Sequence, residues 1–289
     1  MPKNTAIKWL LLSFIAFSTS CAAVQFYGDP EKPFDYSSPA QDQAVKRTDS
    51  IPQTDSLNVV TFNIKKARKI QLAISELQEF EHTKQVDVYL LQEMDEKGVE
   101  AIAKELHLNY LYIPIVHDKA DNKNIGNAIL TKGSIQNPQK LILPHAKWQN
   151  QQRRHATIAE VTIHDKKILV YSVHTETLAM SRQHRMDQID GILQQARIQS
   201  PNYKYVLIGG DFNTLLSKDG QMVIDKFNDN GFDWSTKTVG TTARATLGLI
   251  KPRHDYLFSR GLTLMNSGKI ETSVSSDHYP VFATFLFKG

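Results

Sequence analysis

The sequence lacks several features that would point away from an ordinary globular protein. It has a single cysteine, Cys21, so no disulfide can form within the chain and no cysteine-rich zinc site exists. Neither sign of charge dominates: 34 basic and 30 acidic residues leave +4, too little to imply a nucleic-acid partner by itself. The apolar run from Trp9 to Phe17 is too short to span a bilayer. Because 41% of the 289 residues are hydrophobic, a disordered chain is excluded and one globular domain is expected.

Residues 1–20 have the pattern of a signal peptide. A short basic stretch precedes the apolar run, and small residues follow it up to Cys21. This boundary resembles a bacterial lipoprotein signal, in which the cysteine is lipidated after cleavage. Ordinary cleavage near Ala22 or Ala23 is the alternative, since Ser18 stands where such signals usually have leucine. Both interpretations predict an exported protein, either anchored to the membrane of the bacterial cell envelope through Cys21 or periplasmic or secreted.

The remaining sequence divides into a tether and one domain. Residues 21–56 contain four prolines among Ser, Asp and Gln and show no amphipathic period, which predicts a flexible or extended linker. From residue 57 to residue 289, short apolar runs alternate with helical patterns, and no internal repeat is present. We therefore expect a single layered α/β domain at 57–289.

Polar residues stand at the ends of the predicted strands. Strands are predicted at 57–63, 86–91, 109–116, 126–132, 155–163, 167–174, 204–210, 254–259, 262–270 and 280–287, with helices from about 70, at 97–107, near 181–198 and near 217–230. Asn63 is the last residue of the first strand, and Glu93 closes the second. Asp211 and Asn213 follow Gly209-Gly210 and lie two apart, so both can face one ligand. Taken alone, Asp-x-Asn also fits an Asx turn.

Several motifs together resemble the endonuclease/exonuclease/phosphatase superfamily, which has the deoxyribonuclease-I-like fold. The resemblance covers about 57–287 and rests on order and spacing. It is carried by Asn63, Gln92-Glu93, Gly126-Asn127, His174, Gly209 to Asn213, His254-Asp255-Tyr256 and Ser276-Asp277-His278, with Arg185 and Gln188 matching a further family feature. It implies an α/β fold, a four-layer α/β sandwich of two packed mixed β-sheets flanked by helices. It also implies hydrolysis of phosphate esters with Mg²⁺ or Mn²⁺.

The resemblance assigns metal and water-handling roles to five residues. Glu93 resembles the main metal ligand, with Asn63 beside it and Asp277 close enough to ligate the ion or to orient a bound water. Oxygen ligands of this kind suit Mg²⁺. Asp211 resembles the residue that orients or deprotonates the attacking water, and Asn213 hydrogen-bonds the phosphate or holds that carboxylate. The resemblance leaves open whether one metal ion or two take part, and whether Asp211 or a histidine is the general base.

Five further residues are expected around the phosphate. The resemblance places His278 and His174 against phosphate oxygens, with Asp255 holding His278 in its tautomer and favouring its protonated form. Asn127 is expected to hydrogen-bond within the site and Arg154 to clamp phosphate, although a surface arginine at a strand start explains Arg154 almost as well. His254 departs from the family, which more often has an apolar residue there. We interpret it as a packing or loop histidine.

Two stretches without acidic residues favour a nucleic-acid substrate. One lies between Asp121 and Glu160 and the other runs from Trp234 to His254. Their basic residues are Lys123, Lys132, Lys140, Lys147, Arg153 and Arg154, and Lys237, Arg244, Lys251 and Arg253. A basic rim with Trp148 as a stacking face would suit a nuclease, whereas solvated loops with accidental charge are the plainer alternative.

The alternative substrates are those of a sphingomyelinase-like enzyme or of an inositol-phosphate or phosphoinositide hydrolase, because these enzymes share the same site. A third alternative is a surface binding protein that has lost catalysis. The presence of Glu93, Asp211, Asp277 and His278 argues against it. We expect a monomeric, metal-dependent phosphodiesterase, most simply a nuclease.

Overall fold

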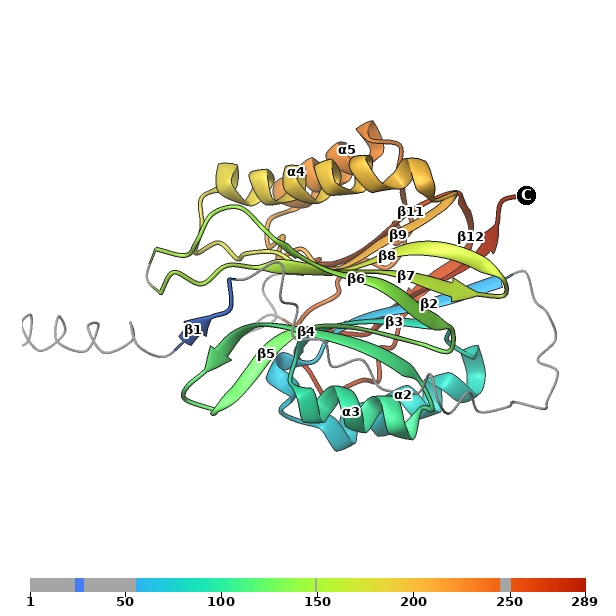
Figure 1. The fold of residues 1–289 in the computed structure, drawn as a ribbon, viewed down its shortest axis with the longest axis horizontal. Helices are drawn as coiled ribbons and strands as arrows, with labels where there is room; N and C mark the ends of the chain where they lie inside the picture. Colours follow the sequence, from blue (N-terminus) through green and yellow to red (C-terminus); the bar gives the residue numbers. More distant parts are fainter. Residues whose placement is uncertain (1–23, 29–55, 149, 245–250) are drawn as a thin grey trace, which may run out of the picture.

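The computed structural model describes residues 24–28, 56–148, 150–244 and 251–289. In these residues two β-sheets pack face to face, and α-helices cover the outer face of each sheet (Figure 1). This confirms the predicted four-layer α/β sandwich. The predicted signal peptide, Cys21 and most of the predicted tether lie outside the described residues. In the described part of the chain, no helix combines the length and apolar character needed to cross a membrane.

The first sheet has seven strands in the order β1-β4-β5-β3-β2-β13-β12. The pair β2–β3 is parallel, and every other neighbouring pair is antiparallel. Helices α2 and α3 cover its outer face (Figure 1). The bounds are β1 Val24–Phe26, β2 Ser56–Asn63, β3 Val88–Met94, β4 Asn109–Asp118, β5 Lys123–Thr131, β12 Leu262–Lys269, β13 Val281–Phe287, α2 Ile70–Lys84, α3 Glu96–Glu105 and a short 3-10 turn, η2, Lys65–Ala67.

The second sheet has six strands in the order β10-β11-β9-β8-β7-β6. It too has one parallel pair, β8–β9, among antiparallel neighbours. Helices α4 and α5 cover its outer face (Figure 1). The bounds are β6 Ser134–Ile142, β7 His155–Ile163, β8 Lys166–His174, β9 Tyr205–Asp211, β10 Asp233–Trp234, β11 Asp255–Arg260, α4 Arg182–Gln199, α5 Ser217–Asp229 and the 3-10 turn η3, Ser200–Asn202.

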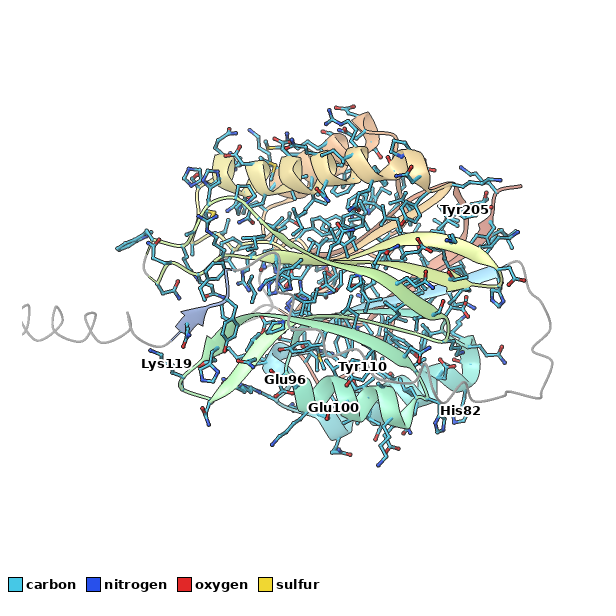
Figure 2. All side chains as sticks on the ribbon, viewed as in Figure 1. His82, Glu96, Glu100, Tyr110, Lys119 and Tyr205 are labelled. Atoms are coloured by element: carbon cyan, nitrogen blue, oxygen red, sulfur yellow. The ribbon has the colours of Figure 1, made fainter. Side chains whose placement is uncertain are left out.

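Burial explains why these segments form strands and helices. Strand β3 is apolar on both faces because one face packs on α2 and α3 and the other on the second sheet. Helix α4 is capped by Ser181, whose side chain accepts a hydrogen bond from the His184 amide, and the helix buries Ile189, Ile192 and Leu193 against the second sheet. Side chains fill the space between the sheets and beneath the helices (Figure 2).

Three strands were not predicted from the sequence: β1, β6 and the two-residue β10. Strand β6, Ser134–Ile142, is mostly polar and contains Pro138, and both features are tolerated because it is an edge strand with a bulge between Gln136 and Gln139. Within the predicted tether, Val24–Phe26 forms β1, which pairs with the edge of β4. Edge strands bury one side only, so their sequences carry a weak apolar pattern.

The topology brings polar strand ends of both sheets to one place. In the parallel pair β2–β3, Asn63 stands opposite Gln92, and in the parallel pair β8–β9, His174 stands opposite Asp211. Strand β11 runs the other way and starts at Asp255, directly beside Asp211. Because the carboxyl ends of parallel strands share an edge, side chains far apart in sequence meet there.

Candidate active site

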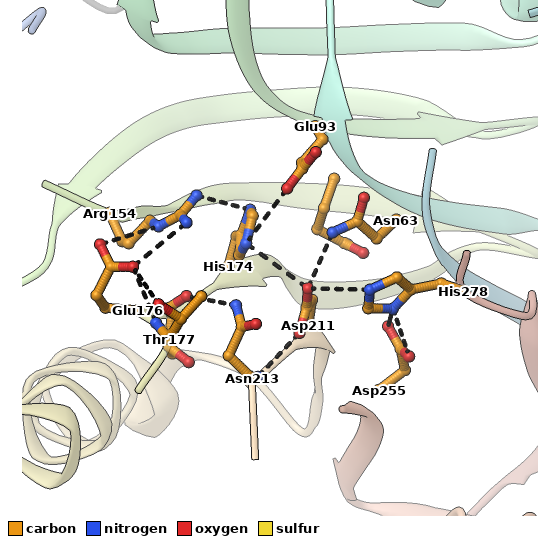
Figure 3. Close-up of polar contacts among 12 residues, drawn as sticks. Asn63, Glu93, Arg154, His174, Glu176, Thr177, Asp211, Asn213, Asp255 and His278 are labelled. Carbon is orange, nitrogen blue, oxygen red and sulfur yellow. Dashed lines mark hydrogen bonds and ion pairs between the residues drawn. The ribbon is translucent and has the colours of Figure 1, made fainter. Parts of the chain in front are cut away.

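A cavity of about 210 Å³ opens where these strand ends meet. Its walls are polar and come from both sheets and their connecting loops. The lining residues are Asn63, Lys65, Lys66, Arg68, Glu93, Arg154, His174, Thr177, Asp211, Asn213, Asp277 and His278. Eight of the ten residues that the sequence assigned to the site are among them, and Figure 3 shows how most of these side chains converge on Asp211.

Asp211 is the buried centre of the site. One carboxylate oxygen accepts a hydrogen bond from the Asn63 amide at 2.9 Å, and the other accepts the backbone N–H of Asn213 at 2.8 Å. Burial opposes its charge, but the nearby rings of His278 and His174 outweigh burial and lower the pKa of Asp211 to about 2. The carboxylate is therefore ionised at neutral pH and fixed in direction.

His278 lies between two buried carboxylates. Its Nδ1 is 2.9 Å from Asp255 Oδ2, and its Nε2 is 3.7 Å from Asp211 Oδ2 (Figure 3). Although burial disfavours an imidazolium, Asp255 and Asp211 raise the pKa of His278 to about 10. His278 is a fixed cation at neutral pH. Asp255 does not line the cavity and acts from behind the ring.

His174 has the opposite protonation state. Burial and the positive charge of Arg154 lower the pKa of His174 to about 4, against the pull of Asp211 and Glu93. Arg154 approaches Nδ1 at 3.4 Å, and because a guanidinium only donates, Nδ1 is assigned as the acceptor and Nε2 as the N–H. That N–H points between Asp211, at 3.6 Å, and Glu93, at 4.0 Å.

Arg154 is held in place by a buried carboxylate. Glu176 is fully buried and lies 3.4 Å from Arg154 Nε, with Lys147 at 3.8 Å. Burial opposes the charge, but Arg154 and the Thr177 amide keep the pKa of Glu176 below its usual range. The side chain of Gln188 on α4 accepts the Glu176 N–H at 2.9 Å. The family feature at Gln188 thus positions Glu176, while Arg185 pairs with Asp219.

Backbone geometry at the cavity is unusual. Glu93 has a φ of 55°, Asn213 has a φ of 48°, and Gly210 has a φ of 149° with a Cβ position 1.9 Å from the Val173 carbonyl oxygen. A bulge between Leu91 and Met94 of β3 accompanies the turn at Glu93. Strained residues concentrate where the surrounding fold can hold them, and here Glu93 and Asn213 line the cavity from such positions.

Three oxygen donors fit a hard divalent cation. Glu93 presents a carboxylate that is 24% exposed, and Asn63 and Asp277 line the same cavity. Asp277 is paired with Lys65 at 2.9 Å, and, although burial opposes this, Lys65 and His278 keep the pKa of Asp277 low. Asp211, Asp255 and His278 also offer ligand atoms within 4.8 Å of one another. Because the Nδ1 of His278 bonds to Asp255 and the pKa of its ring is raised, the oxygen donors are the better candidates to hold a cation.

Asn127 is not where the sequence placed it. Its side chain is buried between the sheets and donates to the backbone oxygens of His155, at 3.1 Å, and Ser172, at 3.3 Å. It does not line the cavity, because β5 lies inside the first sheet and the residue faces the second. Together with Gln92, which donates to the Ser172 hydroxyl at 3.0 Å, it ties the sheets beneath the site.

The acid-free stretches do not form one basic rim. From the first stretch, Arg154 lines the cavity and Lys147 approaches Glu176, but Lys132 pairs with Glu81 at the other end of β5, and Lys140 is buried. From the second, Arg244 donates to the Ser276 carbonyl oxygen at 2.7 Å and lies over Tyr279, so it supports the loop before β13. Charge counted along the sequence does not report which face a side chain reaches.

Sequence reasoning missed one wall of the cavity. Lys65, Lys66 and Arg68 line it, and the only available signal was their position directly after Asn63. Glu176 was missed as well, because a glutamate in a loop has no local pattern.

Comparison with known proteins agrees with this geometry. The model of the Endonuclease/Exonuclease/phosphatase family matches residues 60–278. The chain belongs to this family. Its members are in general hydrolytic phosphoesterases and typically depend on a divalent metal. No curated protein matches the chain.

Solved structures share the fold at low sequence identity. Humanized D. rerio TDP2 is 18% identical with a TM-score of 0.64, covering 80% of this chain and 99% of that one. D. rerio TDP2 complexed with a single-strand DNA product is 19% identical, with a TM-score of 0.63 and coverage of 80% and 98%. A mannosyl-6-phosphatase from Bacteroides thetaiotaomicron is 16% identical, with a TM-score of 0.63 and coverage of 80% and 100%.

Proposed function

We propose that this protein is a divalent-metal-dependent phosphodiesterase that acts on nucleic acid. The observation that carries the proposal is the set of fixed charges around one cavity: ionised Asp211, cationic His278 and the neutral N–H of His174, with Nε2 atoms 3.7 and 3.6 Å from the Asp211 carboxylate. A phosphodiester repels nucleophiles, so its hydrolysis needs positive charge on the non-bridging oxygens and an oriented water.

The chain's own residues meet these needs. Asp211, fixed by Asn63 and the Asn213 amide, is an ionised acceptor that can orient a water for attack. His278 and His174 present N–H donors to the phosphate oxygens, and Arg154 adds charge on the same side as His174. When bound by Glu93, Asn63 and Asp277, Mg²⁺ or Mn²⁺ would supply Lewis acidity toward the phosphate.

Nucleic acid is favoured as substrate by the cations that line the cavity beside the catalytic set. Lys65, Lys66, Arg68 and Arg154 all do so, which suits a polyanion. The DNA product bound to the TDP2 relative supports the same choice. The mannosyl-6-phosphatase neighbour supports a sugar phosphate as the second candidate.

The test is hydrolysis of bis-p-nitrophenyl phosphate and of short DNA and RNA by the purified protein. We expect turnover with Mg²⁺ or Mn²⁺ and loss of turnover in EDTA. Glu93→Gln, Asp211→Asn and His278→Gln should each lower kcat by at least about a hundredfold, because each acts on charge in the transition state. Glu100→Gln, on the outer surface of α3 (Figure 2), is the matched control and should keep the full rate. Undiminished turnover in EDTA would refute the metal requirement.

Sphingomyelin, phosphoinositides and mannose 6-phosphate belong in the same assay. Cleavage of one of these without cleavage of DNA or RNA would reject nucleic acid as substrate and keep the metal mechanism. A protein that cleaves none of these esters would instead be a binding protein on this fold.

We further propose export, with Cys21 as the lipidated first residue of the mature chain and a membrane anchor. Mass spectrometry of the amino terminus decides this. A mature chain that begins at Ala23 or Val24 would show a periplasmic or secreted protein without a lipid.

A further inference from the structure

The turn after β2 brings three cationic side chains to the catalytic cavity. Lys65, Lys66 and Arg68 line the same cavity as Asp211 and His278, and we call residues 65–68 the cationic turn. The catalytic steps described above do not use these three side chains. Arg154 reaches the cavity from the second sheet, whereas the cationic turn belongs to the first.

The backbone of the cationic turn is held in an unfavourable conformation. Lys65, Lys66 and Ala67 have φ values of 43°, 55° and 51°, a region that residues with a Cβ seldom adopt in succession. The fold fixes it from several sides. The Lys65 amide donates to Asn63 Oδ1 at 3.0 Å, the Lys123 ammonium donates to the Lys66 carbonyl oxygen, and Ala67 is buried. Strain kept at a cavity points to a task for the side chains that it displays.

The three cationic side chains of the turn differ in their partners: Lys66 anchors the turn, whereas Lys65 and Arg68 are exposed. Lys66 lies 2.6 Å from the buried carboxylate of Asp118, which ties the turn to the end of β4. Arg68 reaches Asp121 only at 3.7 Å, and Lys65 lies 2.9 Å from Asp277. The side chains of Lys65 and Arg68 are 47% and 56% exposed, so both can turn to an anion from solvent.

The ion pair between Lys65 and Asp277 depends on whether Asp277 binds a metal ion. Asp277 is one of the oxygen donors that fit a metal ion. When Asp277 binds the ion, its carboxylate is shared between the ion and Lys65. Its ammonium then needs another anion close to the same cavity. Arg154 cannot play this role, because Glu176 and His174 hold its guanidinium, which is only 13% exposed.

We propose that Lys65 and Arg68 bind a second phosphate of the substrate, adjacent to the phosphate that is cleaved. This inference rests on the proposed phosphodiesterase function and narrows its substrate class. An ester with one phosphate has no group for these cations, whereas a polynucleotide carries a phosphate on each neighbouring linkage. An inositol bisphosphate carries the same chemistry on a ring, and a sugar monophosphate does not.

The test compares substrates that differ only in flanking charge. A tetranucleotide is cut at its central phosphodiester, with the two flanking linkages either as phosphodiesters or as uncharged methylphosphonates, and the central products are counted. We expect wild-type kcat/KM to be at least about tenfold higher with charged flanks at low salt. Arg68→Gln should reduce that ratio about three- to fivefold, and the double variant Lys65→Gln with Arg68→Gln should reduce it further.

A neighbouring lysine provides the matched control. Lys69 has the same charge, follows Arg68 directly and donates to the Val274 carbonyl oxygen without lining the cavity, so Lys69→Gln should keep the wild-type ratio. Binding is measured separately in EDTA with the charged tetranucleotide. There the slope of log Kd against log salt should fall by about one for Arg68→Gln and stay unchanged for Lys69→Gln.

The outcomes separate this inference from the function on which it rests. Equal wild-type rates on the two tetranucleotides, or an unchanged ratio in Arg68→Gln, would overturn the second-phosphate site and leave the phosphodiesterase standing. No cleavage of either tetranucleotide or of bis-p-nitrophenyl phosphate would refute the function itself. A preference for inositol bisphosphate over inositol monophosphate, with no cleavage of either tetranucleotide, would assign the second phosphate to a ring substrate.

Discussion

Replacing Asp255 by asparagine tests whether a buried carboxylate keeps His278 charged. The pKa of His278 is raised from 6.5 to about 10, which corresponds to roughly 5 kcal/mol in favour of the imidazolium. The amide of Asp255→Asn would keep the shape of the carboxylate but not its charge, while burial would still oppose the imidazolium. The pKa of His278 should therefore fall toward 6.5 or below. At pH 8.5 a pKa of 6.5 leaves about 1% of the ring protonated, so kcat/KM should fall about a hundredfold.

The reasoning predicts the direction in which activity changes with pH. In the wild type His278 stays protonated as pH rises to about 9, so its titration does not change kcat/KM near pH 7. In Asp255→Asn, kcat/KM should fall as pH rises through the lowered pKa of His278. The assay is kcat/KM on bis-p-nitrophenyl phosphate from about pH 5.5 to 9, with an NMR titration of the His278 ring. Asp233→Asn, on an exposed edge of the same sheet, is the control. An unchanged pH profile with a ring pKa still near 10 would refute the reasoning.

Two predictions concern stability. His174 has a pKa of about 4 in the folded protein and about 6.5 when unfolded, so the unfolded chain binds its proton first and stability falls by roughly 3 kcal/mol from pH 7 to pH 4. In urea unfolding, the free energy of unfolding of His174→Gln should fall less between pH 7 and pH 4 than that of the wild type. The same pH dependence in both proteins would contradict this prediction. Gly210→Ala should cost more than about 3 kcal/mol in thermal unfolding, because its Cβ would meet the Val173 carbonyl oxygen, whereas Gly231→Ala, with open space around it, should cost about 1 kcal/mol. Similar losses in the two glycine variants would show that the contact at Gly210 relaxes.

Local sequence patterns predicted most elements of this fold and most of the side chains that line the cavity. The strand at 155–163 has the predicted bounds because its residues are buried on both faces and form a continuous run. Asp211 and Asn213 could be assigned because they follow two glycines at a strand end, and Asp277-His278 because they precede the last strand. Motif order then identified the family, and with it the four-layer sandwich.

The alternation of apolar and polar residues along a strand does not show which face of its sheet packs against the other sheet and which faces helices or solvent. Asn127 shows this limit: the family resemblance placed it within the site, but its side chain lies between the sheets and bonds to the backbone of β7 and β8. Lys132 and Lys140 show the same limit for charge, since one, just past β5, pairs at the far end of the sheet and the other, on β6, is buried.

The neutral state of His174 and the cationic turn were decided by tertiary structure alone, whereas the sequence already predicted a protonated His278. His174 and His278 are the same residue type, yet burial and Arg154 lower the pKa of His174, whereas Asp255 and Asp211 raise the pKa of His278 against the effect of burial. The left-handed turn at Lys65 is held by contacts with Asn63, Lys123 and Asp118. Each of these effects depends on groups distant in sequence meeting where water is largely excluded, and a linear sequence carries no measure of that distance.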